Sequence, residues 1–126
     1  MAKTKTLSKL KGDVQKVFNA YIRQRDEGKP CISCGKVTKL QAGHYYPVST
    51  HQGLRYNEDN VHGECARCNC FDEGHLINYR ENLIERIGMG RFGALEVSAK
   101  LYKMHGYKFT RPELLEIKQK YLSLLR

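Results

Sequence analysis

Two Cys-x-x-Cys pairs constrain the fold of this 126-residue chain more than any other feature. They are Cys31 with Cys34 and Cys65 with Cys68. Two residues between thiolates let both sulfurs of a pair reach one ion, and two such pairs complete a tetrahedral zinc site. The insert between the pairs is longer than the roughly 15–20 residues of a short zinc ribbon. We therefore expect a strand–loop–strand excursion whose ends are clamped by the metal.

Other uses of the cysteines fit less well. A redox Cys-x-x-Cys is disfavoured because two copies converge and no thioredoxin-like βαβ pattern surrounds them. A secreted disulfide scaffold is disfavoured because the first ten residues are polar and lysine-rich, unlike a signal peptide, and paired cysteines in a reducing cytosol more often bind metal. Four thiolates leave no vacancy for water, so this zinc should be structural. Cys70 is interpreted as a spare small apolar residue, with an alternative ligand as the weaker reading.

Hydrophobic periodicity predicts a mostly helical chain around a short β segment. The expected helices run from about Leu7 to Arg25, from after Cys68 to Gly88, from Arg91 to about Met104, and from the capping box at Thr110–Glu113 almost to the C-terminus. Two strands, Leu40–Tyr46 and Asn60–Glu64, are expected on either side of the polar connection Pro47–Asp59. The chain should form one α+β domain, with a basic N-terminal helix in 1–30, a zinc-braced core in 31–88 and C-terminal helices in 89–126.

The positive charge of the chain is concentrated outside the cysteine segment. Residues 1–30 carry eight basic and three acidic side chains, residues 31–80 carry five of each, and residues 81–126 carry nine and five, for a net charge of +9. An excess of this size in a small domain favours a polyanionic partner. The first helix should place Lys9, Lys16 and Arg23 in one line on its polar side, because they recur every seven residues. An incidental lysine-rich surface is the alternative.

The insert between the cysteine pairs contains the residues that indicate an activity. They are Gly43-His44-Tyr45-Tyr46-Pro47, then Asn60-Val61-His62, and Asn69 directly after the last paired cysteine. A strand ending in His-x-x-Pro, an Asn before the second pair and an Asn after it resemble the HNH motif, a ββα-metal (His-Me) finger often braced by four cysteines. More narrowly, the segments from Gln41 to Asn69 and the later Asn78-Tyr79-Arg80 resemble the NinG/Rap recombination endonucleases of lambdoid phages. The resemblance covers about residues 1–90.

This resemblance implies a role for each matching residue. His44 would be the general base that takes a proton from the attacking water, because a neutral imidazole with a pKa near ~6.5 suits that task. Asn60 would hold the backbone and ring of His44, and Asn69 would supply an oxygen to a catalytic Mg²⁺ or Mn²⁺. The sequence departs from the family pattern at Gly43, where many HNH nucleases have an Asp or His ligand. Asp72, Glu73 and His75 are the candidates to replace that ligand.

Further residues are candidates for contact with nucleic acid. His62, His51, Arg55 and His75 lie in or near the insert, and Lys9, Lys16 and Arg23 lie on the first helix. For His62, a surface histidine without a role is an equal alternative to contact with substrate or support of the site.

The resemblance implies a metal-dependent endonuclease that acts on branched recombination DNA, such as Holliday junctions and D-loops. No apolar run approaches the roughly 18–20 residues that cross a bilayer, so we expect no membrane partner and a cytoplasmic location, in the host cell if a phage encodes the chain. A homodimer would supply two active sites for paired incisions, and we leave it open against a monomer. Two other classes remain open: a non-catalytic zinc-stabilised DNA-binding module, and a protein-interaction zinc domain whose basic flanks are incidental.

Overall fold

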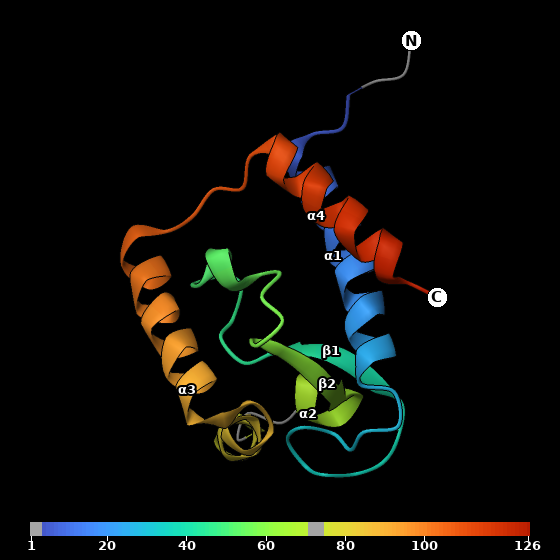
Figure 1. The fold of residues 1–126 in the computed structure, drawn as a ribbon, viewed down its shortest axis with the longest axis vertical. Coiled ribbons are helices and arrows are strands. Elements are labelled where there is room, and N and C mark those ends of the chain that lie inside the picture. The colour runs from blue at the N-terminus through green and yellow to red at the C-terminus, as the bar shows by residue number, and fades with distance from the viewer. Residues whose placement is uncertain (1–3, 71–74) are drawn as a thin grey trace.

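A two-stranded antiparallel hairpin lies between helices in the computed structural model (Figure 1). The structure describes residues 4–70 and 75–126. Strand β1 (Leu40–His44) pairs with β2 (Val61–Cys65), so that Leu40 lies opposite Cys65 and His44 lies opposite Val61. This combination of helices with a small sheet confirms the α+β class predicted from the sequence.

Strand β1 is shorter than predicted, because beyond His44 the side chain of Asn60 takes the place of a backbone partner. Tyr45 N still donates to Asn60 O at 2.9 Å, but Tyr46 N donates to the side-chain Oδ1 of Asn60 at 2.8 Å. Pro47 follows and has no N–H to continue a ladder. The predicted strand to Tyr46 therefore ends two residues early.

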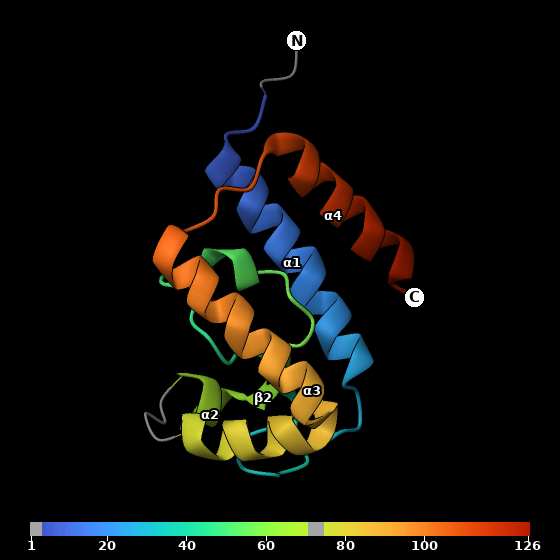
Figure 2. The same cartoon turned by 60° about the vertical axis from the view of Figure 1, so that its left-hand side comes forward.

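Helices α1 (Leu7–Arg25) and α4 (Arg111–Leu124) lie side by side and enclose the first apolar cluster (Figure 1, Figure 2). The bounds of α1 are those predicted, and the predicted capping box is present, with Thr110 Oγ1 accepting from Glu113 N. At the centre of the cluster, the ring of Phe18 meets the ring of Tyr121 edge-on at 4.9 Å. The buried members of this cluster are Leu10, Val14, Phe18, Ile22, Tyr56, Val61, Phe109, Leu114 and Tyr121.

Helix α3 (His75–His105) is one helix bent at Gly88, and its two halves run in different directions (Figure 1, Figure 2). Gly88 has φ 87° and ψ 159°, a conformation that is essentially restricted to glycine. The two helices predicted on either side of Gly88 correspond to the halves of α3, except that the first was predicted to start after Cys68, which lies in the separate short helix Ala66–Cys70. The second half packs with the short helix η1 (Gln52–Leu54) in a second apolar cluster, in which Leu54 and Phe92 are fully buried. No helix among the described residues is long and apolar enough to cross a membrane.

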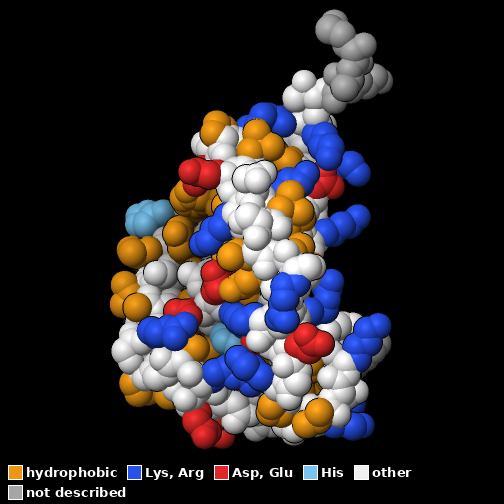
Figure 3. All heavy atoms as spheres, turned by 45° about the vertical axis from the view of Figure 1, so that its right-hand side comes forward, with side chains coloured by type: hydrophobic (Ala, Val, Ile, Leu, Met, Phe, Trp, Pro, Cys, Tyr) orange, Lys and Arg blue, Asp and Glu red, His pale blue; other side chains and the backbone are white. Residues whose placement is uncertain are grey.

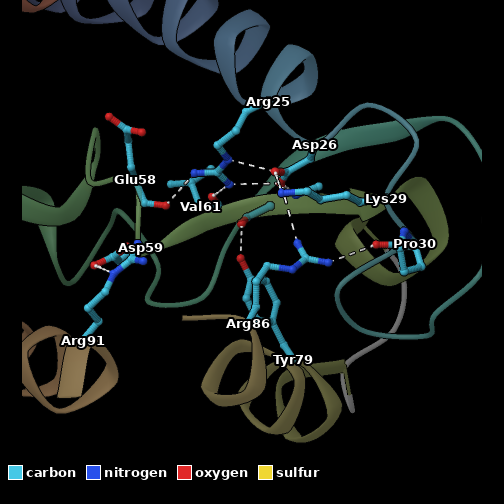
Figure 4. Close-up of polar contacts among 12 residues, drawn as sticks. Arg25, Asp26, Lys29, Pro30, Glu58, Asp59, Val61, Tyr79, Arg86 and Arg91 are labelled. Carbon is cyan, nitrogen blue, oxygen red and sulfur yellow. Dashed lines mark hydrogen bonds and ion pairs between the residues drawn. The ribbon is translucent and has the colours of Figure 1, made fainter. Parts of the chain in front are cut away.

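The buried carboxylate of Asp26, the residue after α1, contacts both β2 and α3 (Figure 4). Asp26 is fully buried and accepts hydrogen bonds from Arg25 at 2.8 and 3.0 Å and from Gly63 N in β2 at 2.7 Å. The guanidinium of Arg86, from α3, lies 3.8 Å away. Burial alone would raise the pKa of Asp26, but the hydrogen bonds from Arg25 and Gly63 lower it to about 2. Asp26 is therefore charged at neutral pH and holds α1 against the hairpin.

Candidate functional site

Four cysteine sulfurs converge at one end of the hairpin. Cys31 and Cys34 precede β1, Cys65 ends β2, and Cys68 lies in the short helix α2 (Ala66–Cys70). All four sulfurs lie within 4.8 Å of one another, and those of Cys34 and Cys65 are 3.8 Å apart. A tetrahedral ion with Zn–S bonds of about 2.3 Å requires a sulfur separation of about 3.8 Å. These cysteines can therefore hold a metal ion such as zinc.

Burial raises the pKa of the Cys31 and Cys68 thiols, and hydrogen bonding from the backbone lowers that of Cys65. A metal ion bound by these cysteines would take them as thiolates, so its binding would release protons. Cys70 is exposed and stands outside the cluster, with its sulfur 3.5 Å from Gln41 Oε1. The reading of Cys70 as an alternative ligand gains no support from this position.

Asn60 is completely buried and clamps the chain just after His44. Its Oδ1 accepts from Tyr46 N, and its Nδ2 donates to Tyr46 O at 3.1 Å and to Leu54 O at 3.3 Å. The sequence predicted that Asn60 would hold the backbone and ring of His44 itself. The structure corrects this prediction: among the described residues, the Asn60 side chain bonds Tyr46 and Leu54, and so positions the loop that follows β1.

His44 has one ring nitrogen fixed by a backbone carbonyl. Its Nε2 lies 3.0 Å from Arg55 O, and because a carbonyl can only accept, Nε2 must carry the proton. In the neutral ring, Nδ1 is then the unprotonated nitrogen. Burial lowers the pKa of His44, although the Arg55 carbonyl acts in the opposite direction. A neutral imidazole with a defined tautomer can accept a proton at Nδ1.

Asn69 lies close to Gly43 on another part of the hairpin surface. Its Nδ2 donates to Gln41 Oε1 at 2.8 Å, and its Oδ1 lies 3.2 Å from the point that a Cβ on Gly43 would occupy. Oε1 of Glu64, a residue not predicted from the sequence, lies 2.3 Å from the same Cβ position. Glu73 and Asp72, predicted as replacement ligands, lie outside the described residues.

His44 and Asn69 lie on opposite faces of β1. Side chains alternate along a strand, so Gln41 and Gly43 face one way and Ala42 and His44 the other. The Gly43 face meets Asn69 and α3, whereas Ala42 packs against the α1 cluster. The imidazole of His44 and the carboxamide of Asn69 therefore do not share one face of β1. His44 is the last residue of β1, so a phosphodiester in contact with both would have to pass around the end of the strand.

Two of the predicted DNA contacts are buried. His62 is 3% exposed and His51 is 8% exposed. Burial, and after it the charge of Arg25, lower the pKa of His62 to about 3. The His51 ring packs against Tyr46 at 4.9 Å, and Thr50 Oγ1 lies 2.8 Å from its Nδ1. Both side chains are largely covered by the protein, and their contact with DNA stays a prediction.

Two other side chains that were predicted to contact DNA, those of His75 and Arg55, bind partners within the protein. His75 directs Nδ1 to Oε2 of Glu64, and its side chain is only 15% exposed. Arg55 donates from Nε to Gln15 Oε1 at 2.9 Å. The structure thus assigns both side chains intramolecular partners and leaves contact with DNA untested.

The three basic residues of α1 are exposed as the spacing predicted. Lys9, Lys16 and Arg23 follow one side of the helix, away from its buried residues. Figure 3 shows Lys and Arg side chains spread along the length of one face of the molecule, with acidic side chains between them. This stripe can neutralise phosphates, which is the main source of non-specific affinity for DNA.

Comparison with known proteins decides the family. A family model described as "Bacteriophage Lambda NinG protein" matches residues 1–126. The chain belongs to the NinG family. It is similar to protein ninG of Salmonella phage P22 (40% identity over 114 residues, 89% of this chain and 54% of the relative) and to protein ninG of Escherichia phage lambda (39%, 89% and 53%). The chain thus spans about half the length of the curated NinG relatives it matches. No solved structure gives a significant match.

Sequence reasoning missed two residues that lie at the Gly43 side of the hairpin. Tyr79, fully buried in α3, donates its hydroxyl to Gly43 O at 2.7 Å and so fixes β1 beside His44 (Figure 4). Glu64, fully buried in β2, faces the same side as Gly43. Glu64 carried a signal that could have been read: it is an acidic residue on the facing strand, near the glycine that stands where a ligand was expected. Tyr79 carried none, because a tyrosine in an apolar stripe reads as core.

Proposed function

We propose that this chain is the nuclease part of a metal-dependent DNA endonuclease that cuts branched recombination intermediates, such as Holliday junctions and D-loops. The observation that carries the proposal is the state of His44: a neutral ring whose Nε2–H is held by Arg55 O and whose Nδ1 is free of that bond. The metal-binding cysteines and the basic stripe of α1 support it. The branched substrate comes from the resemblance of the insert to recombination endonucleases.

In this proposal His44 Nδ1 takes a proton from a water molecule, and the water oxygen attacks the scissile phosphorus. The bond from phosphorus to the 3′ oxygen breaks, and the departing oxygen takes a proton from water, which leaves a 5′ phosphate and a 3′ hydroxyl. A bound divalent ion would supply positive charge for the phosphate, and Asn69 would be one of its ligands through Oδ1. Arg55 O holds the Nε2–H of His44, so that Nδ1 is the nitrogen that accepts the proton. Lys9, Lys16 and Arg23 would hold the DNA backbone.

The test compares wild type with His44→Ala on a labelled four-way junction and on a linear duplex of the same sequence, with Mg²⁺. Removing a general base should reduce the cleavage rate by about 10²–10⁴-fold, while zinc content and junction affinity stay unchanged. His105→Ala, at the exposed end of α3, is the matched control and should cut normally. Cutting by His44→Ala at the wild-type rate would refute the role of His44, and equal cutting of junction and duplex would refute the substrate class.

A non-catalytic zinc-stabilised DNA-binding module is the second candidate. One observation favours it: His44 and Asn69 lie on opposite faces of β1. It predicts that wild type and His44→Ala bind the junction equally and that neither cuts it with Mg²⁺ or Mn²⁺. Replacement of Lys9, Lys16 and Arg23 by Gln then tests the shared DNA interface. Each lost phosphate contact should reduce the slope of log affinity against log salt by about 0.9, and an unchanged slope would instead favour a protein-interaction domain.

A further inference from the structure

A buried carboxylate with one unpaired oxygen lies on the Gly43 face of the hairpin. Glu64 is completely buried, and its Oε2 accepts hydrogen bonds from Ser33 Oγ and His75 Nδ1. Among the described residues, its Oε1 has no hydrogen-bond partner. A carboxylate oxygen removed from water without a donor or cation is unfavourable. The side chain is thus anchored through one oxygen and presents the other.

The absence of a side chain at Gly43 makes room in front of that oxygen. A Cβ at position 43 would lie 2.3 Å from Glu64 Oε1 and 3.2 Å from Asn69 Oδ1. Two oxygens at these distances from one point are at most 5.5 Å apart, the sum of the two. They therefore converge on a space that any larger residue at position 43 would fill.

The orientation of the Asn69 amide is fixed by its neighbour. Asn69 Nδ2 donates to Gln41 Oε1, which can only accept, so Asn69 Oδ1 must be the atom directed to the Gly43 side. The short helix α2 carries both Asn69 and the cysteine Cys68, so the metal-binding cluster also restrains this amide.

We propose that Glu64 Oε1 and Asn69 Oδ1 bind a divalent cation, Mg²⁺ or Mn²⁺, over Gly43. Carboxylate and amide oxygens are the hard ligands these ions prefer, and two protein ligands leave room for waters and a phosphate. Glu64 supplies from β2 the negative charge that a side chain at position 43 would otherwise supply from β1. Ser33 and His75 are positioning residues, because they hold Oε2 and so aim Oε1.

This inference deepens the proposed function, since the ion is the one that cleavage requires, but its test does not depend on cleavage. Zinc-loaded protein without DNA is titrated with Mn²⁺, and free Mn²⁺ is followed by electron paramagnetic resonance. Wild type should bind one Mn²⁺. Glu64→Gln keeps the shape but removes the charge and should weaken Mn²⁺ binding by at least about tenfold, with zinc content unchanged. Glu81→Gln, the same change at an exposed position of α3, should bind as wild type does.

Two further variants keep the test decisive if the buried Glu64→Gln does not fold. Gly43→Ala places a methyl group in the space between the two oxygens, and Asn69→Ala removes Oδ1 from a half-exposed side chain that hydrogen-bonds Gln41. Each should weaken Mn²⁺ binding at least about tenfold. Unchanged Mn²⁺ affinity in a folded Glu64→Gln or Asn69→Ala, or no Mn²⁺ bound by wild type, overturns the proposal.

The two proposals fail separately. If Mn²⁺ binding depends on Glu64 but wild type cuts no DNA, the cation site stands and the nuclease function falls. If wild type cuts DNA in a metal-dependent manner but Glu64→Gln binds Mn²⁺ as wild type does, the function stands and this site falls.

Discussion

Replacing Asp26 by Asn should destabilise the fold, because this buried carboxylate joins the end of α1 to β2. The Asp26 carboxylate accepts two hydrogen bonds from the Arg25 guanidinium and a third from Gly63 N. An Asn can place its oxygen where Oδ2 lies and still accept from Gly63 N and Arg25 Nη2, but its NH2 group then faces Arg25 Nε, which loses its acceptor. The half-buried guanidinium also loses its charged partner, while its bonds to Glu58 O and Val61 O remain.

The expected magnitude follows from the one lost bond, from Arg25 Nε, and from the lost charge on the acceptor of the other two. A hydrogen bond to a charged group contributes roughly 1.5–3 kcal/mol, so Asp26→Asn should lower the free energy of unfolding by about 3 kcal/mol. For a domain of this size that corresponds to a fall of roughly 10 °C in Tm. Urea unfolding of zinc-loaded protein at pH 7, followed by circular dichroism, measures the change.

The matched control makes the same chemical change in an exposed ion pair. Asp13 contacts Lys5 Nζ at 2.7 Å, and the Lys5 side chain is 50% exposed. Exposed pairs contribute little, so Asp13→Asn should unfold close to wild type. If Asp26→Asn loses no more stability than Asp13→Asn, then the buried carboxylate does not join α1 to β2 as argued. The pH dependence of stability gives an independent check. Because the pKa of Asp26 is lowered to about 2, its contribution to the free energy of unfolding is present above pH about 4 and is lost as the pH falls toward 2.

Three further predictions concern the bend, the cysteines and His44. Gly88→Ala should lower the free energy of unfolding in urea by about 1–3 kcal/mol, because alanine disfavours the backbone conformation of Gly88. Gly90→Ala has open space around it and should raise the free energy of unfolding by about 0.5–1 kcal/mol. Similar effects of the two substitutions would refute the assigned bend. Cys34→Ser should lose bound zinc and several degrees of Tm, whereas Cys70→Ser should keep both in a metal assay and a thermal scan. If the nuclease proposal is right, the cleavage rate should rise with pH to a plateau through a midpoint below 6.5, because burial lowers the pKa of His44 and the neutral ring is active; a midpoint above 6.5 would contradict that environment.

Local signals allowed most of the secondary structure to be predicted. Helix α1 and the capping box of α4 depend on apolar spacing and on residues three apart, which a sequence displays directly. The second half of α3 was the less obvious helix, because Gly93 and Val97 disfavour it. Its buried residues Phe92 and Leu95 explain why packing prevails over propensity there.

The candidate site was less predictable, because its geometry depends on contacts between distant segments. The cysteine spacing predicted a cluster that the structure brings together. The burial of His51 and His62 was not predicted, because whether a histidine is buried depends on packing that no local pattern encodes. The partner of the His44 ring, a backbone carbonyl eleven residues away, has no side-chain signature at all.

The bend in α3 has a consequence for how the length of this helix can change among its relatives. Its first half places Tyr79 against the hairpin, and its second half places Phe92 and Leu95 over the loop that carries Leu54. Within either half, one inserted or deleted residue rotates the rest of that half by about 100° around its helix axis. That half would then turn its apolar side to water, so evolutionary gaps in aligned relatives should be rare within residues 75–87 and 89–105, and should fall at the non-helical Gly88 or outside the helix.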